Sequence, residues 1–291
     1  MRKLCLLLVA LLVVATCGCA PAKEAAPILA TTRPVYDLTT ALCQGTSLEV
    51  GLLISENVSC LHDYSLSTAQ MKNLENAQMV IMSGAGLEEF QSDILLRCNY
   101  LLDASKGVAL IECEHDHDHD HAGHHHDADA HIWLSPENAK TMAQNICSGL
   151  MAQFPAQKDV FQKNLTTVVS DLEKLKTYGE QTLKELSCRE LITFHDGFAY
   201  LAQAFDLTIL SAVEEESGSE ASAKELIELI EEVRHHNLPA VFNETNGSPS
   251  ASGIISAETG AKVFTLDMCM GNGNYFDKMY QNINTLKEAL G

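Results

Sequence analysis

Histidine and acidic residues alternate in one stretch of the chain, which reads CEHDHDHDHAGHHHDADAHIWLSP from position 113 to position 136. Eight of the twelve histidines lie in this stretch. Imidazole nitrogens and carboxylate oxygens are ligands of divalent transition metals, so the stretch predicts metal binding. It differs from a purification tag, because a tag is uninterrupted and lies at a terminus, whereas this run continues into apolar sequence.

The last histidine of the stretch has a different setting from the others. His131 precedes the apolar run IWL, whose burial can hold its ring in place before a ligand binds. The other seven have almost no apolar neighbours, so we expect a mobile loop that binds metal weakly, because ordering it costs entropy at each binding event. These auxiliary residues are His115, His117, His119, His121, His124, His125 and His126.

Four residues outside this mobile segment occupy comparable positions in the chain. His62 lies in LHDYSLS, His131 in AHIWLSP and His195 in TFHDGF, each where a strand should pass into a helix. Asp267 ends a further expected strand in KVFTLD. Open parallel sheets bind ligands at the carboxyl ends of their strands. Three imidazoles and one carboxylate at such positions suit a borderline divalent ion such as zinc.

The elements that must position these residues alternate between strand and helix, which predicts an α/β fold with parallel sheets. The alternation occurs in an N-terminal lobe at 27–155, which includes the His-rich loop at 113–130, and again in a C-terminal lobe at 188–291. Between them, apolar residues recur at three- and four-residue steps over 156–187, which predicts a helix of about 45 Å that joins the lobes. Ser135 and Pro136 should begin an earlier helix, as N-cap and first residue.

The N-terminus begins with MRKLCLLLVALLVVATCGCA, in which a basic pair precedes a short apolar run and a cysteine. The run is shorter than the roughly 20 residues of a transmembrane helix, so it predicts a secretory signal. The cysteine and the polar sequence after it resemble a bacterial lipoprotein signal. We expect a signal at 1–19 with Cys19 lipidated and a linker at 20–26, with Cys17 or ordinary cleavage as alternatives. The protein should lie outside the cytoplasm, anchored to the membrane by lipid.

The acidic balance of the chain restricts its partners. The formal net charge of −20 disfavours nucleic acid and anionic lipid headgroups as ligands, and it is compatible with a cation. Solubility outside the cell explains the charge equally well.

The cysteines after position 19 are odd in number and contain no CxxC pair, which argues against a zinc ribbon or a dense disulfide framework. Cys60 and Cys269 each lie two residues from a candidate ligand, so a sulfur ligand or a bridge between them stays open.

Several motifs together resemble the zinc and manganese solute-binding proteins of bacterial ABC importers, of the zinc-uptake (ZnuA-like) type. The segments are HDYSLS, HIWLSPENA, FHDGFAYLAQAFDL and FNETNGSPSASGIISAETGAKVFTLD, in the family's order, and the resemblance covers residues 27–291. It implies two Rossmann-like lobes, a rigid connecting helix and one metal ion in the cleft between the lobes. The family's three histidine ligands match His62, His131 and His195, and its acidic fourth ligand matches Asp267.

This resemblance implies a receptor that captures Zn2+ outside the cytoplasm and delivers it to a membrane permease with its ATPase. Zinc would be the transported ligand of a non-enzymatic, monomeric protein that binds no nucleic acid. Manganese-binding members generally carry a carboxylate where this chain has His195, so the residue favours zinc over a manganese or iron receptor. The His-rich loop is likewise typical of the zinc branch.

Other readings of these residues stay open. A metal-dependent adhesin or a zinc buffer would use the same fold without a transporter. A zinc-dependent hydrolase would need a general base, and the usual HExxH motif is absent. Asp63 and Asp196 follow candidate ligands and fit a role in orienting them better than a catalytic one. His235 and His236 end an expected helix, where histidine is favoured by the helix dipole.

Overall fold

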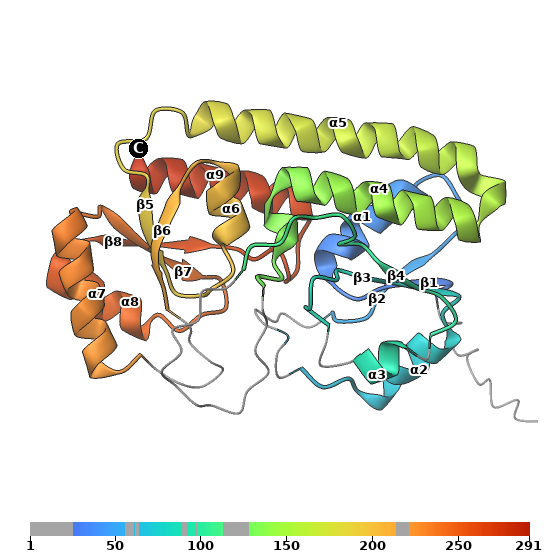
Figure 1. The fold of residues 1–291 in the computed structure, drawn as a ribbon, viewed down its shortest axis with the longest axis horizontal. Helices are drawn as coiled ribbons and strands as arrows, with labels where there is room; N and C mark the ends of the chain where they lie inside the picture. The colour runs from blue at the N-terminus through green and yellow to red at the C-terminus, as the bar shows by residue number, and fades with distance from the viewer. Residues whose placement is uncertain are drawn as a thin grey trace, which may run out of the picture.

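The computed structural model describes residues 26–55, 61, 64–88, 92–96, 98–112, 128–213 and 221–291. Three groups of the candidate residues lie outside these ranges: His62 with Asp63 and Cys60, the seven auxiliary histidines from His115 to His126, and Cys19 with Cys17. Two lobes lie side by side beneath one long helix (Figure 1). In the described ranges, no helix combines the length and the apolar character needed to cross a bilayer.

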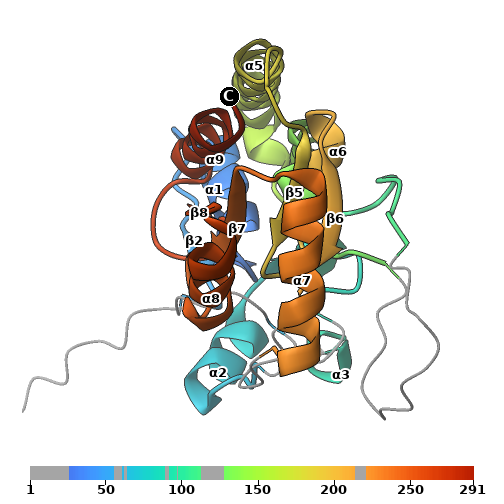
Figure 2. The same cartoon turned by 90° about the vertical axis from the view of Figure 1, so that its left-hand side faces the viewer.

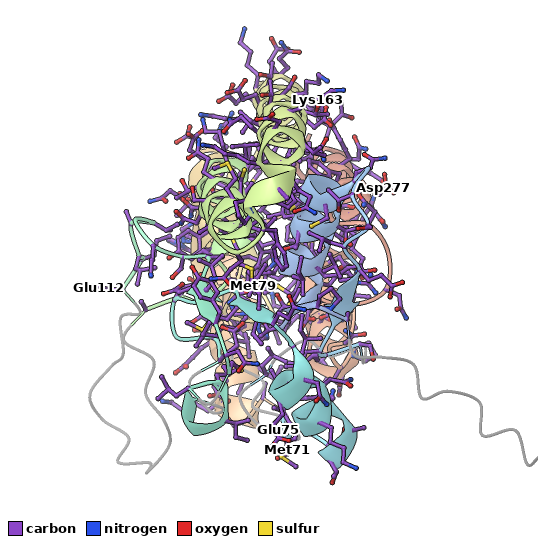
Figure 3. All side chains as sticks on the ribbon, turned by 90° about the vertical axis from the view of Figure 1, so that its right-hand side faces the viewer. Met71, Glu75, Met79, Glu112, Lys163 and Asp277 are labelled. Carbon is purple, nitrogen blue, oxygen red and sulfur yellow. The ribbon has the colours of Figure 1, made fainter. Side chains whose placement is uncertain are left out.

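The N-terminal lobe contains a parallel sheet of four short strands in the order β2-β1-β3-β4. The strands are β1 (Ile28–Ala30), β2 (Val50–Leu52), β3 (Met79–Met82) and β4 (Leu101–Asp103). Around them lie α1 (Arg33–Cys43), α2 (Thr68–Asn76), α3 (Ser92–Leu95) and α4 (Pro136–Gln153). Met79 lies in the interior, whereas Lys163 and Glu75 lie on helices at opposite ends of the view in Figure 3. Because helices cover both faces of the sheet, its strands carry apolar side chains on both faces.

The C-terminal lobe repeats this arrangement in a parallel sheet of order β6-β5-β7-β8. The strands are β5 (Glu190–Thr193), β6 (Thr208–Ala212), β7 (Ala240–Glu244) and β8 (Lys262–Leu266). The helices are α6 (Ala199–Ala204), α7 (Ala223–His236), α8 (Ser250–Thr259) and α9 (Tyr275–Leu290). The two parallel sheets with their helices confirm the predicted α/β fold with two lobes.

Local sequence explains where several helices begin. Ser135 accepts a hydrogen bond from Asn138 N at 3.4 Å and Pro136 opens α4, as predicted. Ser67 and Gln70 form a capping box at the start of α2, and Ser222 and Glu225 do the same for α7. Each box satisfies backbone N–H groups that have no partner within the first helical turn.

The long helix α5 (Lys158–Thr182) spans both lobes, as Figure 1 shows, and Figure 2 shows it end-on above α9 and α6. At one end, Asn164 Nδ2 donates to the carbonyls of Leu42 and Gln44 in the N-terminal lobe, both at 2.8 Å. At the other end, Gly179 lies against the ring of Phe205 in the C-terminal lobe, where any Cβ would overlap it. The larger apolar core contains residues of both lobes, so the two lobes are packed against each other. The exact bounds of the signal, linker, lobes and connecting helix stay a prediction.

Candidate metal site

His131 is held rigidly at the interface between the lobes and is 5% exposed. Its backbone N donates to Asp129 Oδ1 at 2.8 Å, and its ring Nδ1 lies 2.8 Å from the same oxygen. The 3-10 turn Ile132–Leu134 follows directly, and its three side chains are fully buried. A carboxylate on Nδ1 selects the tautomer that leaves Nε2 available to a metal ion. The apolar run therefore anchors the ring, as the sequence predicts.

His195 lies beside His131, although the two are far apart in sequence. It follows β5, and its ring centroid is 5.4 Å from that of His131 with the planes at 83°. Its Nδ1 lies 3.7 Å from Glu244 Oε2, at the end of β7. Glu244 is only 4% exposed, so this carboxylate is buried next to the imidazole. The structure brings two of the predicted ligands together, each with a carboxylate on its Nδ1 side.

Gly197 permits the close approach of these segments. A Cβ at this position would lie 2.8 Å from His131 Nδ1 and 2.5 Å from the Met268 methyl carbon. Any larger side chain would therefore displace the His131 ring or Met268. The loop after β5, the turn at His131 and the loop after β8 thus meet at one point.

Asp267 follows β8 and is fixed from several directions. Asn282 of α9 accepts from its backbone N–H at 2.9 Å and donates to its carbonyl at 2.8 Å. Its Oδ1 accepts from Cys269 N at 2.7 Å and from Lys278 Nζ at 3.0 Å. Cys269 has a φ of 62°, a left-handed conformation that is uncommon for a residue other than glycine.

Trp133 connects the Asp267 loop to the histidine turn. Its Nε1 donates to the Met268 carbonyl at 2.8 Å, and its ring lies edge-on to His131 with centroids 5.4 Å apart. Tyr275 completes the connection, because its hydroxyl donates to the Trp133 carbonyl at 2.7 Å. All three groups are buried, so these hydrogen bonds hold the two segments in a fixed relation.

The described residues contain only part of the predicted ligand set. Among them, no group of three or more His, Cys, Asp and Glu side chains is arranged to hold a metal ion. The rings of His131 and His195 are in contact. The Asp267 carboxylate forms an ion pair with Lys278. His62 lies outside the described ranges. The geometry can therefore present two imidazoles to one ion, and the remaining ligands stay a prediction.

The structure also places the other residues that the sequence singles out. His236 Nδ1 lies 2.9 Å from Glu190 Oε2 at the start of β5, the opposite end of that strand from His195. His235 and His236 end α7, as expected for helix-end residues. Cys269 is a free, buried thiol, and burial, followed by the charge of Asp267, raises its pKa well above the ordinary value.

Sequence reasoning missed four residues that shape this site. Asp129 and Glu244 contact or approach the histidines, Gly197 makes room for them, and Lys278 binds Asp267. Glu244 had a recognisable signal, because it ends the expected strand PAVFNE as the candidate ligands follow theirs. Gly197 and Lys278 carry no such signal, because their roles depend on contacts between distant segments.

The sequence matches a family model described as zinc-uptake complex component A, periplasmic, over residues 28–289. It is 30% identical over 302 residues to the high-affinity zinc uptake system protein ZnuA of Bacillus subtilis (strain 168), covering 96% of this chain and 94% of that protein. The crystal structure of the metal-dependent lipoprotein YcdH from Bacillus subtilis is similar, with a TM-score of 0.77 and 26% identity over 90% of this chain and 98% of that chain.

A zinc-bound relative has the same fold. The structure of Zn(II)-bound AdcA from Streptococcus pneumoniae matches with a TM-score of 0.77 and 25% identity, over 91% of this chain and 57% of that longer chain. These findings confirm the resemblance that the motifs predict. The chain belongs to the zinc-uptake complex component A family of periplasmic proteins.

Proposed function

We propose that this protein is an extracytoplasmic receptor that binds one Zn2+ between its lobes and delivers it to the permease of an ABC importer. The observation that carries the proposal is the adjacent pair of imidazoles at the interface between the lobes, of which His131 is buried and His195 is partly exposed. Each has a carboxylate on its Nδ1 side, an arrangement that orients histidine ligands. Membership of the zinc-uptake family supports the same assignment.

The proposed ligands are His62, His131, His195 and Asp267. Three neutral imidazoles with one oxygen ligand suit zinc better than manganese, which prefers a larger share of oxygen ligands. Glu244 orients His195, and Asp129 orients His131. The seven loop histidines, His115 to His126, act as an auxiliary site that collects ions weakly.

The remaining parts of the proposal concern location and partners. Cys19 is the proposed lipid attachment site, and the similarity to YcdH of Bacillus subtilis, a metal-dependent lipoprotein, supports an anchor. The family description places its members in the periplasm, which supports an extracytoplasmic site of action. The proposed partners are a membrane permease and its ATPase, with the receptor acting as a monomer.

Zinc titration of matched histidine variants tests the proposal. Zinc at 100 times its dissociation constant should add about 2.7 kcal/mol to the free energy of unfolding, because it binds only the folded chain. His195→Ala should lose most of this stabilisation, whereas His235→Ala, at the end of α7, should keep it. If zinc stabilises both variants equally, His195 is not a ligand of the metal.

Hydrolase activity is the competing outcome. A receptor has no need of a general base beside the metal, so the zinc-loaded protein should not cleave ester, peptide or β-lactam substrates. Zinc-dependent turnover that disappears in His195→Ala would overturn the receptor assignment.

A further inference from the structure

Lys278 is a buried cation in the first part of α9. Its exposed fraction is 8%, and its neighbour Asp277 points outward at the surface (Figure 3). The side-chain stem packs against Gly273, where a Cβ would lie 3.0 Å from Lys278 Cε. A lysine near a helix N-terminus is disfavoured by the helix dipole, and burying its charge costs further free energy. Such a residue needs a compensating partner.

Asp267 supplies that partner. Lys278 Nζ donates to Asp267 Oδ1 at 3.0 Å, and their side chains are 10% and 20% exposed. Asp37 is another nearby carboxylate, but its Oδ2 accepts from Tyr275 N at 2.8 Å and its Oδ1 lies 3.8 Å from Arg33. Asp37 is therefore engaged elsewhere, and the ammonium group is directed to Asp267.

The pairing affects what Asp267 can offer a metal ion. Its Oδ1 already accepts two hydrogen bonds, from Lys278 Nζ and Cys269 N. An ion at this carboxylate must use Oδ2 or displace the ammonium group, and in either case it approaches a positive charge. Carboxylate oxygen is a preferred ligand of Mn2+, whereas imidazole suits Zn2+, so a weakened oxygen ligand penalises Mn2+ more.

We propose that Lys278 is a specificity-determining positioning residue, which withholds part of the Asp267 carboxylate from the metal and so favours Zn2+ over Mn2+. The inference rests on the proposed function and adds a mechanism of selection to it. Charge repulsion alone would weaken all dications about equally, because Zn2+ and Mn2+ carry the same charge. The ratio of the two affinities is therefore the quantity that reports the role of Lys278.

The experiment compares the dissociation constants of Zn2+ and Mn2+, measured by competition with a chelator, in four proteins. These are the unmodified chain, Lys278→Met, Lys278→Arg and the control Lys287→Met. Lys287 lies near the other end of α9, where its Nζ donates to the Glu185 carbonyl, so the control removes the same charge from the same helix. Lys278→Met should tighten Mn2+ binding about tenfold more than Zn2+ binding, the effect of one altered ligand interaction.

The variants separate this inference from its alternatives. Lys278→Arg keeps the charge and should keep the original ratio, and Lys287→Met should leave it unchanged. An unchanged ratio in Lys278→Met, with zinc still bound tightly, would overturn the inference alone. If the unmodified chain binds neither metal, the proposed function and the inference both fail.

A second pair of variants tests the inference if Lys278→Met does not fold. Lys278→Gln retains a polar group that can donate to Asp267 but removes the charge, and thermal unfolding without metal verifies its fold. In this background, Asp267→Asn should lower Mn2+ affinity more than it does in the unmodified chain, because the carboxylate no longer shares its negative charge with an ammonium group and contributes more to binding. Equal losses in both backgrounds would show that Lys278 and Asp267 are not coupled in metal binding.

Discussion

Gly197 lies where the loop after β5 meets His131 and Met268, so Gly197→Ala tests how rigidly the site is packed. The new Cβ would lie 2.5 Å from Met268 Cε and 2.8 Å and 2.9 Å from His131 Nδ1 and Cε1. The Met268 methyl group can rotate away at little cost. The His131 ring cannot, because Asp129 holds its Nδ1 and Trp133 and His195 flank it.

The required movement exceeds what a zinc site tolerates. Ordinary carbon contacts are about 3.5 Å, so the His131 ring must shift by roughly 0.7 Å. Zinc–nitrogen distances in proteins stay within about 0.2 Å of their usual values. We therefore expect zinc affinity to fall roughly 10- to 100-fold, as for other changes that misorient a histidine ligand, and overpacking to lower stability by about 1–3 kcal/mol.

Chelator competition measures the zinc affinity, and chemical denaturation without metal measures the stability. Gly253→Ala in α8 is the matched control, because no atom beyond its chain neighbours and its own helix backbone lies within 4 Å of its Cβ position. A helical Gly-to-Ala change in open space should stabilise the protein by about 0.5–1 kcal/mol and leave zinc binding unchanged. Normal zinc affinity in Gly197→Ala would refute the conclusion that packing holds the His131 ring in the orientation that zinc needs.

Three further predictions concern the Trp133 hydrogen bond, the buried Glu88 and the His-rich loop. Trp133→Phe removes the donor to the buried Met268 carbonyl, so urea denaturation should give an unfolding free energy lower by about 1–3 kcal/mol; an unchanged value would mean that this hydrogen bond contributes nothing. Burial raises the pKa of Glu88 above its ordinary value of 4.5, so the folded protein holds its proton more tightly than the unfolded chain. Stability should therefore fall as pH rises from about 4.5 through the folded-state pKa, and this dependence should be absent from Glu88→Gln in parallel denaturation curves. Deletion of residues 114–127 should leave one tight zinc ion and remove only weaker ones in isothermal titration, and loss of the tight ion would make the loop the principal site.

The sequence by itself determined the fold class and the general location of the site. Apolar strand runs alternate with helical stretches, and this local pattern reflects burial on both faces of a parallel sheet. The same reasoning located His131 and His195 after expected strands, and the structure brings their rings to 5.4 Å. Capping residues such as Ser135 were predictable for the same reason, because they act within a few residues of themselves.

Only the tertiary structure decided which side chains surround these ligands. Glu244 approaches His195 from another strand, and the Trp133 ring reaches the Met268 carbonyl across the lobe interface. Lys278 turns inward to Asp267 because the loop between β8 and α9 reverses the chain, and Gly197 matters only because His131 packs against it. Such contacts join residues that are distant in sequence, so hydrophobic periodicity and motif spacing carry no information about them. They depend on packing within the C-terminal lobe and between the two lobes, and that packing sets which oxygen and nitrogen atoms a metal ion can reach.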